Sequence, residues 1–181
     1  TLAREMALES EYVMGTFARK PVEFVEGHGM TLIDDAGNEY LDFLSGIGVC
    51  SLGHCHPSIV QAVSDQAAKL IHVSNYYYIE HRGEVAQLLS NMLNAYVDEP
   101  SPETWKTFFA NSGAEANECA IKLARLYARR RTEAAGKDAE LAPRLIVTLA
   151  KSFHGRTLAT LAATAQPAKQ EAFQPLPAGF T

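Results

Sequence analysis

The residues best suited to chemistry lie at a short turn that joins a run of β-forming residues to a long helical segment. The turn consists of Asn111, Ser112, Gly113 and Ala114. The segment from Ala114 to Arg131 contains no Gly or Pro and is rich in strong helix formers. A helix beginning there presents free N–H groups and the positive end of its dipole, and the small residues let a phosphate group come close. The turn therefore predicts an anion site.

The same turn also fits plain helix capping. Ser112 followed three residues later by Glu115 matches a capping box, in which each side chain accepts from a backbone N–H group at the helix start. The preceding aromatic and β-branched residues 105–109 favour a buried strand. The local pattern alone leaves capping and anion binding both open.

A second candidate turn, residues 152–156, follows the continuous apolar run Leu145 to Leu149. Such a run is typical of a strand buried on both faces of a sheet, and open α/β folds bind ligands at the carboxyl edge of their strands. Arg156 has the side chain best shaped to clamp a carboxylate. With the first turn, Phe153 and Arg156 suggest a pocket for a phosphorylated aromatic cofactor and a carboxylate substrate. Taken singly, Phe153 fits a core residue better than a cofactor-stacking ring, and Arg156 fits a surface charge better.

Two other polar clusters were considered as sites. Cys50, His54, Cys55 and His56 suggest a metal, but the last three are consecutive and no paired zinc-ligand spacing is present, so we expect a tight turn before a helix instead. The stretch 74–78, with Asn75 and three tyrosines, fits either a pocket lining or the cover of a core edge.

Composition limits the function classes. The 181 residues are 47% hydrophobic and 20% charged with a net charge of −5, which fits a globular protein and gives no electrostatic case for nucleic acid or membrane partners. The arginines near the end of the long helix complement its dipole. No membrane span or signal peptide is evident, and three cysteines fit a reducing compartment, so the cytoplasm is expected.

The pattern of elements predicts an α/β fold with a parallel layer in its second half. Gly and Pro positions and hydrophobic periodicity set the expected boundaries. They are a helix over 2–14, a β-hairpin within 22–43, an ordered loop over 45–56, helices over 57–71 and 85–96, a turn over 98–102, a strand over 105–109, a helix over 114–131, a surface insertion over 132–143, a strand over 145–149, a short helix ending at 164 and an irregular tail over 166–181.

Five ordered motifs carry a family resemblance. They span residues 42–49, 52–57, 109–118, 121–125 and 152–157. In that order they resemble the first half of the class III pyridoxal-phosphate aminotransferases, and most of all the acetylornithine, ornithine and succinylornithine aminotransferase subgroup. The resemblance implies part of the pyridoxal-phosphate-dependent transferase fold type I, with residues 1–57 as an N-terminal segment of the small domain and residues 58–181 as the first part of the cofactor-binding large domain.

The resemblance also implies roles for individual residues. Gly113 and Ala114 would donate backbone N–H groups to the phosphate of pyridoxal 5'-phosphate, with Ser112 beside them. Phe153 would stack on the cofactor ring, with His154 also on the cofactor side, and Arg156 would hold the substrate α-carboxylate. The expected borders of the substrate pocket are Val49, Asn75 and Tyr77.

The implied reaction moves an amino group from N-acetylornithine or a related ornithine derivative to 2-oxoglutarate, in arginine biosynthesis and in a homodimer. The alternatives are another class III aminotransferase, acting on ornithine, succinylornithine or 4-aminobutyrate, and a non-catalytic fragment that binds pyridoxal phosphate or another phosphate. The family's cofactor-binding lysine is expected after Thr181, and neither Lys122 nor Lys151 lies in a matching motif. We therefore assign no catalytic residue or metal ligand, and expect the chain alone to be inactive.

Overall fold

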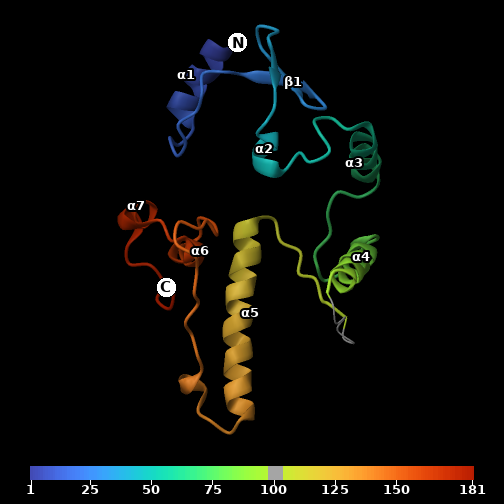
Figure 1. The fold of residues 1–181 in the computed structure, drawn as a ribbon. Helices are drawn as coiled ribbons and strands as arrows, with labels where there is room; N and C mark the ends of the chain where they lie inside the picture. The colour runs from blue at the N-terminus through green and yellow to red at the C-terminus, as the bar shows by residue number, and fades with distance from the viewer. Residues whose placement is uncertain (98–103) are drawn as a thin grey trace. The chain divides into compact units, whose positions relative to one another are not determined.

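The computed structural model describes residues 1–97 and 104–181, which form two compact units, Thr1–Tyr78 and Ile79–Thr181 (Figure 1). We call them unit 1 and unit 2 and describe each by itself. The turn expected over 98–102 lies outside the described residues. The domain boundary expected after residue 57 falls inside unit 1. Because the units reflect contacts within this chain and the domains were inferred from a resemblance, that boundary stays a prediction.

Unit 1 combines an N-terminal helix, a small antiparallel sheet and a third helix after an irregular loop. The sheet order is β1-β2-β3, and β1 is bulged between Phe24 and Glu26. The expected helix, hairpin and second helix are confirmed, with ends shifted by a few residues. The elements are α1 (Leu2–Tyr12), β1 (Phe24–His28), β2 (Thr31–Asp34), β3 (Glu39–Leu41), α2 (Ser45–Gly48) and α3 (Pro57–Lys69).

A buried carboxylate organises the turn between β2 and β3. Asp34 Oδ1 accepts from the backbone N–H groups of Ala36 and Asn38 at 3.0 and 2.8 Å, and Oδ2 accepts from Asn38 Nδ2 and the Tyr40 hydroxyl at 2.9 Å each. These bonds, led by the one from the Asn38 side chain, lower the pKa of Asp34 to about 2. The turn is therefore held by an ionised Asp34.

A second carboxylate holds the loop over 45–56 in place. Asp42 Oδ1 accepts from the N–H groups of Leu44 and Ser45, both at 2.8 Å, and Oδ2 lies 2.7 Å from His54 Nε2. The His54 contact is the largest cause of a lowered pKa at Asp42. His54 also exchanges two backbone hydrogen bonds with Gly29 of the hairpin, at 2.9 and 2.8 Å. The loop is thus ordered, and within it α2 is a short irregular turn with positive φ at Ser45 and Ile47.

Unit 2 is built on the 22-residue helix α5. The expected long helix, the helix before it and the short helix ending near Thr164 are confirmed. The tail, expected to be irregular, also contains a short helix. The elements are α4 (Arg82–Ala95), α5 (Gly113–Ala134), η1 (Ala139–Leu141), α6 (Leu158–Ala163), α7 (Pro167–Gln170) and η2 (Glu171–Phe173).

The two strands expected in unit 2 are not formed as regular strands. Residues 105–109 have no β partner among the described residues, and Trp105 instead bonds to Ser90 Oγ and Asn94 Oδ1 of α4 at 3.2 and 2.8 Å. In the segment 145–149, Ile146 makes an isolated parallel bridge to Phe180. A strand needs a neighbour to receive its hydrogen bonds, and no further strand among the described residues supplies one to either segment.

The pairing of Ile146 with the tail nevertheless has the parallel sense that the sequence predicts. Ile146 donates to Gly179 at 2.9 Å, Thr181 donates to Ile146 at 3.0 Å, and Thr148 donates to Thr181 at 2.7 Å. The tail residues 179–181 thus pair in parallel with residues 146–148 through these three hydrogen bonds. The sequence did not identify this partner, because the prolines before it hide the β pattern.

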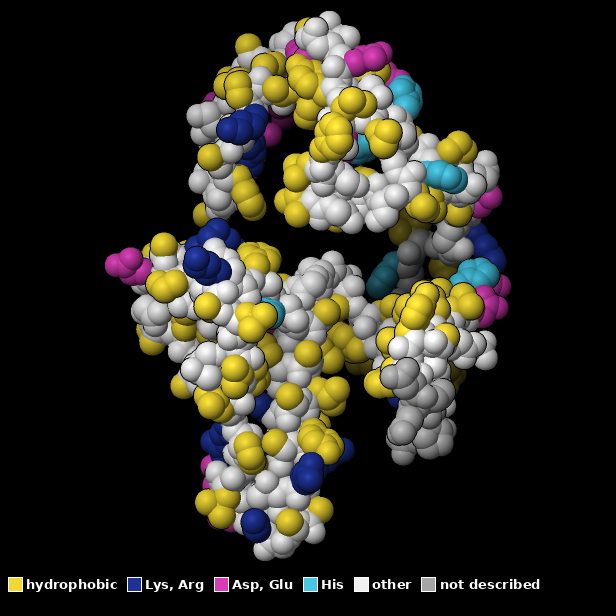
Figure 2. Space-filling view, in the orientation of Figure 1, with side chains coloured by type: hydrophobic (Ala, Val, Ile, Leu, Met, Phe, Trp, Pro, Cys, Tyr) yellow, Lys and Arg dark blue, Asp and Glu magenta, His cyan; other side chains and the backbone are white. Residues whose placement is uncertain are grey.

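Little apolar surface is buried. Among the described residues, the fully buried side chains are Thr160 in α6 and Thr164 at its C-terminal end, and the buried hydrophobic residues are Ile121, Ala142, Leu161 and Ala163. The accessible surface is 15037 Å², whereas two compact units of half this mass would together expose roughly 10,000 Å². Figure 2 shows the hydrophobic side chains that result at the surface. No helix in the described part of the chain is long and apolar enough to cross a membrane.

Candidate functional site

The start of α5 has two free N–H groups. Ser112 is the N-cap residue, and its Oγ accepts from the Glu115 N–H at 3.1 Å, which confirms the predicted cap. Glu115 Oε2 returns to the N–H of Asn111 at 2.6 Å, one residue earlier than in a standard capping box. The N–H groups of Gly113 and Ala114 have no hydrogen-bond partner among the described residues. They lie at the positive end of a 22-residue helix.

The turn 153–156 lies directly against this helix start. Gly155 is buried with φ +139°, and a Cβ atom built on it would lie 2.8 Å from Ala114 Cβ and 2.5 Å from Thr160 Oγ1. Only a glycine allows this approach, because any side chain would overlap both neighbours. The structure therefore brings the two turns that the sequence singled out into direct contact within unit 2.

Polar side chains of α5 hold the second turn in place. Asn117 Nδ2 donates to the carbonyl of His154 at 2.7 Å, and Glu118 accepts from the Thr157 hydroxyl. The N–H of His154 donates to Thr164 Oγ1 at 3.0 Å, at the end of α6. The backbone of the turn is thus fixed from both sides, by α5 and by α6.

The side chains of this turn present an aromatic ring and a cation. Arg156 Cζ lies 5.1 Å from the centroid of the Phe153 ring, a cation–π distance. Phe153 is 61% exposed, Arg156 is exposed and His154 is half-buried. A ring open to solvent can stack on a planar group, and a guanidinium group can clamp a carboxylate.

The remaining three predicted residues belong to unit 1. Val49 follows α2, and Asn75 and Tyr77 lie in the connection after α3; all three are exposed. The structure describes them within unit 1 only, so their place at a substrate pocket stays a prediction. His54, considered as a metal ligand, is bound to Asp42. The part of the chain that the structure describes contains no group of three or more His, Cys, Asp or Glu residues that could hold a metal.

The sequence did not identify the residues that join the two turns. The five motifs contain these residues, Gly155, Asn117, Glu118 and Thr157, but the sequence assigned no role to them. A signal was present for the helix: Ala114, Asn117, Glu118 and Ile121 follow the i, i+3, i+4, i+7 spacing, so two polar residues share the face that Ile121 buries. Polar residues on a buried face need partners, and here the His154 carbonyl and the Thr157 hydroxyl supply them.

The arrangement fits the phosphate end of a cofactor. Two free N–H groups point from a helix start, and a Cβ atom built on Gly113 would meet no atom within 4 Å, so the space in front of it is open. An anion there would be stabilised by both N–H groups and the helix dipole. The ring of Phe153 lies on the turn packed against the same helix start.

Comparison with known proteins points to one family. Residues 16–181 match the family model for aminotransferase class-III. The chain is 48% identical over 169 residues to the acetylornithine aminotransferase of Nitrosomonas europaea and 45% identical over 173 residues to that of Methanocaldococcus jannaschii. These matches cover 93% and 96% of this chain, and 39% of each relative. The chain therefore spans about two fifths of the length of these curated relatives.

Solved structures show the same fold. The match to an ornithine aminotransferase from Toxoplasma gondii covers all of this chain and 39% of the aminotransferase chain. Its TM-score is 0.83, at 27% sequence identity. An acetylornithine aminotransferase from Elizabethkingia anophelis covers 82% of this chain and 35% of its own with a TM-score of 0.65, at 32% identity. The arrangement of elements described above is thus that of part of an aminotransferase.

Proposed function

Because the chain belongs to the class III aminotransferases, we propose that it forms the N-terminal part of an enzyme that moves an amino group from N-acetylornithine, or a related ornithine derivative, to 2-oxoglutarate. The fold is part of the α/β fold type I of the enzymes that depend on pyridoxal phosphate, the cofactor that the family implies. The choice of N-acetylornithine is supported by the names of the relatives at 44 to 48% identity.

The observation that carries the proposal is the contact between the start of α5 and the turn 153–156. Gly155 lies against Ala114, and Asn117 fixes the carbonyl of His154. Packed elements of unit 2 therefore carry three groups: the unpaired N–H groups at the start of α5, the exposed ring of Phe153 and the guanidinium group of Arg156. Preorganised donors of this kind bind an anion without the cost of ordering them first.

In the proposed site each side chain has a separate task. The N–H groups of Gly113 and Ala114 would hold the cofactor phosphate, while Ser112 keeps the helix start formed through its bond to Glu115. Phe153 would cover the cofactor ring, with His154 beside it. Arg156 would fix the substrate α-carboxylate, and Val49, Asn75 and Tyr77 would border the substrate.

Pyridoxal phosphate supplies an electron sink for the carbanion that amino-group transfer requires. The chain's own residues would bind and orient it. Acid–base catalysis would fall to a lysine that we expect outside these 181 residues, since neither Lys122 nor Lys151 lies in the matching motif, and the chain by itself would then be inactive. A fragment that binds the cofactor without catalysis is the alternative.

We further propose a homodimer in the cytoplasm, acting in arginine biosynthesis. The names of the relatives support the pathway. The three cysteines Cys50, Cys55 and Cys119 are free thiols, which fits a reducing compartment.

The proposal is tested with the full-length protein loaded with pyridoxal phosphate. Glutamate formation from 2-oxoglutarate is measured with N-acetylornithine, ornithine, succinylornithine and 4-aminobutyrate as donors in turn. The highest kcat/KM is expected for N-acetylornithine. A higher value for another donor would reassign the substrate, and no glutamate from any donor, with the cofactor bound, would favour the non-catalytic alternative.

A further inference from the structure

A cavity lies in unit 2, along the later turns of α5. Its volume is 240 Å³, and it is formed by α5 and the segment 139–144 that contains η1. The charged groups in its lining are the guanidinium groups of Arg125, Arg129 and Arg144 and the carboxylate of Glu140. Positive charge therefore dominates the wall.

One of the three arginines has a buried donor without a partner. Arg125 Nη2 donates to the carbonyl of Ala178 at 3.1 Å, and Arg125 Cζ lies 5.4 Å from the centroid of the Phe180 ring, so the guanidinium group is held in place. Its Nε atom is buried and has no hydrogen-bond partner among the described residues. A buried polar atom without a partner in a native protein calls for an explanation, and a bound ion is one of the few available.

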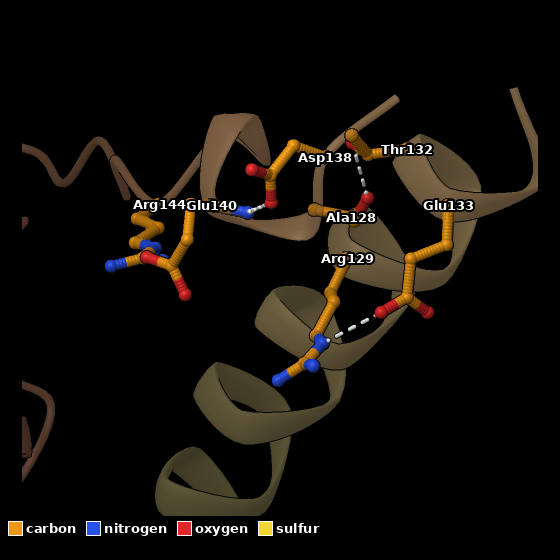
Figure 3. Close-up of polar contacts among 7 residues, drawn as sticks. All are labelled: Ala128, Arg129, Thr132, Glu133, Asp138, Glu140 and Arg144. Carbon is orange, nitrogen blue, oxygen red and sulfur yellow. Dashed lines mark hydrogen bonds and ion pairs between the residues drawn. The ribbon is translucent and has the colours of Figure 1, made fainter. Parts of the chain in front are cut away.

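The other two arginines, Arg129 and Arg144, have further N–H donors beyond those that bond to a carboxylate. Arg129 Nε donates to Glu133 at 2.9 Å (Figure 3), and Arg144 Nη2 donates to Glu140 at 2.5 Å. Each is one contact of a group that carries five N–H donors. The pKa of Arg129 is raised, mainly by its hydrogen bond to Glu133 and to a smaller extent by the negative charge of Glu140. The charge of Glu140 therefore acts on Arg129 of α5.

We propose that this cavity binds a small phosphate-bearing anion. Three guanidinium groups against two carboxylates, those of Glu140 and of Glu133 bonded to Arg129, leave an excess of one positive charge, which favours an anion such as phosphate. Guanidinium forks also match the geometry of phosphate oxygens. The cavity is smaller than the clefts of about 300 Å³ or more that hold drug-sized ligands, so the occupant is a small ion or the phosphate end of a larger molecule.

This site is separate from the proposed cofactor site. Arg125 lies twelve residues after Gly113, which is about 18 Å along the helix axis. The negative end of the α5 dipole opposes an anion here, so binding depends on the arginines alone. The proposal therefore stands or falls independently of the proposed function.

The test uses isothermal titration of inorganic phosphate into the full-length protein saturated with pyridoxal phosphate, so that the cofactor's own phosphate site is filled. Ionic strength is held constant with chloride. The double variant Arg129→Gln, Arg144→Gln is expected to bind phosphate at least about 10-fold more weakly. The control is Arg130→Gln, which removes one positive charge next to Arg129 on the same helix but outside the cavity, and it should bind phosphate as the wild type does.

A third variant guards against loss of folding. Glu140→Gln removes the carboxylate that competes for Arg144, so phosphate should bind more tightly, a gain that a damaged protein would not give. No phosphate binding by the wild type, equal loss in the double variant and in Arg130→Gln, or weaker binding by Glu140→Gln would each overturn the proposal.

Discussion

The contact between Gly155 and the start of α5 predicts a large effect from the smallest substitution. In Gly155→Ala the new Cβ atom would lie 2.5 Å from Thr160 Oγ1 and 2.8 Å from Ala114 Cβ. Overpacking of this kind costs about 1–3 kcal/mol, and a backbone near φ +139° costs a residue with a side chain about 1–3 kcal/mol more. We expect a loss of about 2–6 kcal/mol in unfolding free energy.

The turn 153–156 can escape the clash by moving away from α5. That movement would separate Phe153 from the helix start, so affinity for pyridoxal phosphate should fall at least about 10-fold, the equivalent of about 1.4 kcal/mol. Urea unfolding of the full-length enzyme without added cofactor and a fluorescence titration of the cofactor measure the two effects.

Gly136→Ala is the matched control. Gly136 also has a positive φ, +70°, but a Cβ atom built on it would meet nothing within 4 Å. This variant suffers the backbone cost alone, about 1–2 kcal/mol, and should keep wild-type cofactor affinity. If the two variants were equal in stability within about 0.5 kcal/mol, or in cofactor affinity, the reasoning about the Gly155 contact would be refuted.

Three further predictions follow from single side chains. Ser112→Ala removes the cap on Glu115 N–H and should lower the unfolding free energy by about 1 kcal/mol, while Ser112→Thr should restore most of it; equal losses in urea unfolding would contradict the capping role. Asp34→Asn should lower the unfolding free energy above pH about 4, because the hydrogen bonds to Asp34 stabilise the fold only while its carboxylate is ionised. The difference in unfolding free energy between variant and wild type should vanish as the pH falls from 3.8 to about 2. A difference independent of pH in acid unfolding would contradict this. Arg156→Lys should raise KM for the amino donor about 10- to 100-fold with cofactor affinity unchanged, and an unchanged KM in steady-state kinetics would remove Arg156 from the substrate site.

The helices of this protein could be predicted because their signals are local. Pro57 at the start of α3, the cap at Ser112 and the uninterrupted helix formers of α5 each act within a turn or two of the chain. The hairpin turn is local as well, since Asp34 reaches only as far as Tyr40. These elements formed within a few residues of their expected bounds.

The strands of unit 2 could not be predicted in the same way, because a strand depends on partners distant in sequence. Residues 105–109 have strand composition but bond to α4, and Ile146 pairs with tail residues that no pattern singled out. The candidate site could likewise be predicted only in part. Ser112 and Arg156 were identified by residue type, whereas the roles of Asn117 and Gly155 depend on which turn packs against α5.

The central claim is that the free N–H groups at the start of α5 bind the cofactor phosphate, and Gly113→Pro tests it most directly. Proline is favoured at the first position of a helix and lacks only the N–H group, Ser112 already has the extended backbone that a following proline requires, and the space around Gly113 is open. Gly113→Ala, which keeps the N–H group, is the control.

The measurement is the dissociation constant of pyridoxal phosphate, and of pyridoxal without its phosphate, for both variants in the full-length protein. Losing one hydrogen bond to a charged group, worth about 1.5–3 kcal/mol, should weaken pyridoxal phosphate binding by about 10- to 100-fold in Gly113→Pro relative to Gly113→Ala. Pyridoxal should bind both variants equally. Equal affinity of the two variants for pyridoxal phosphate would contradict the claim.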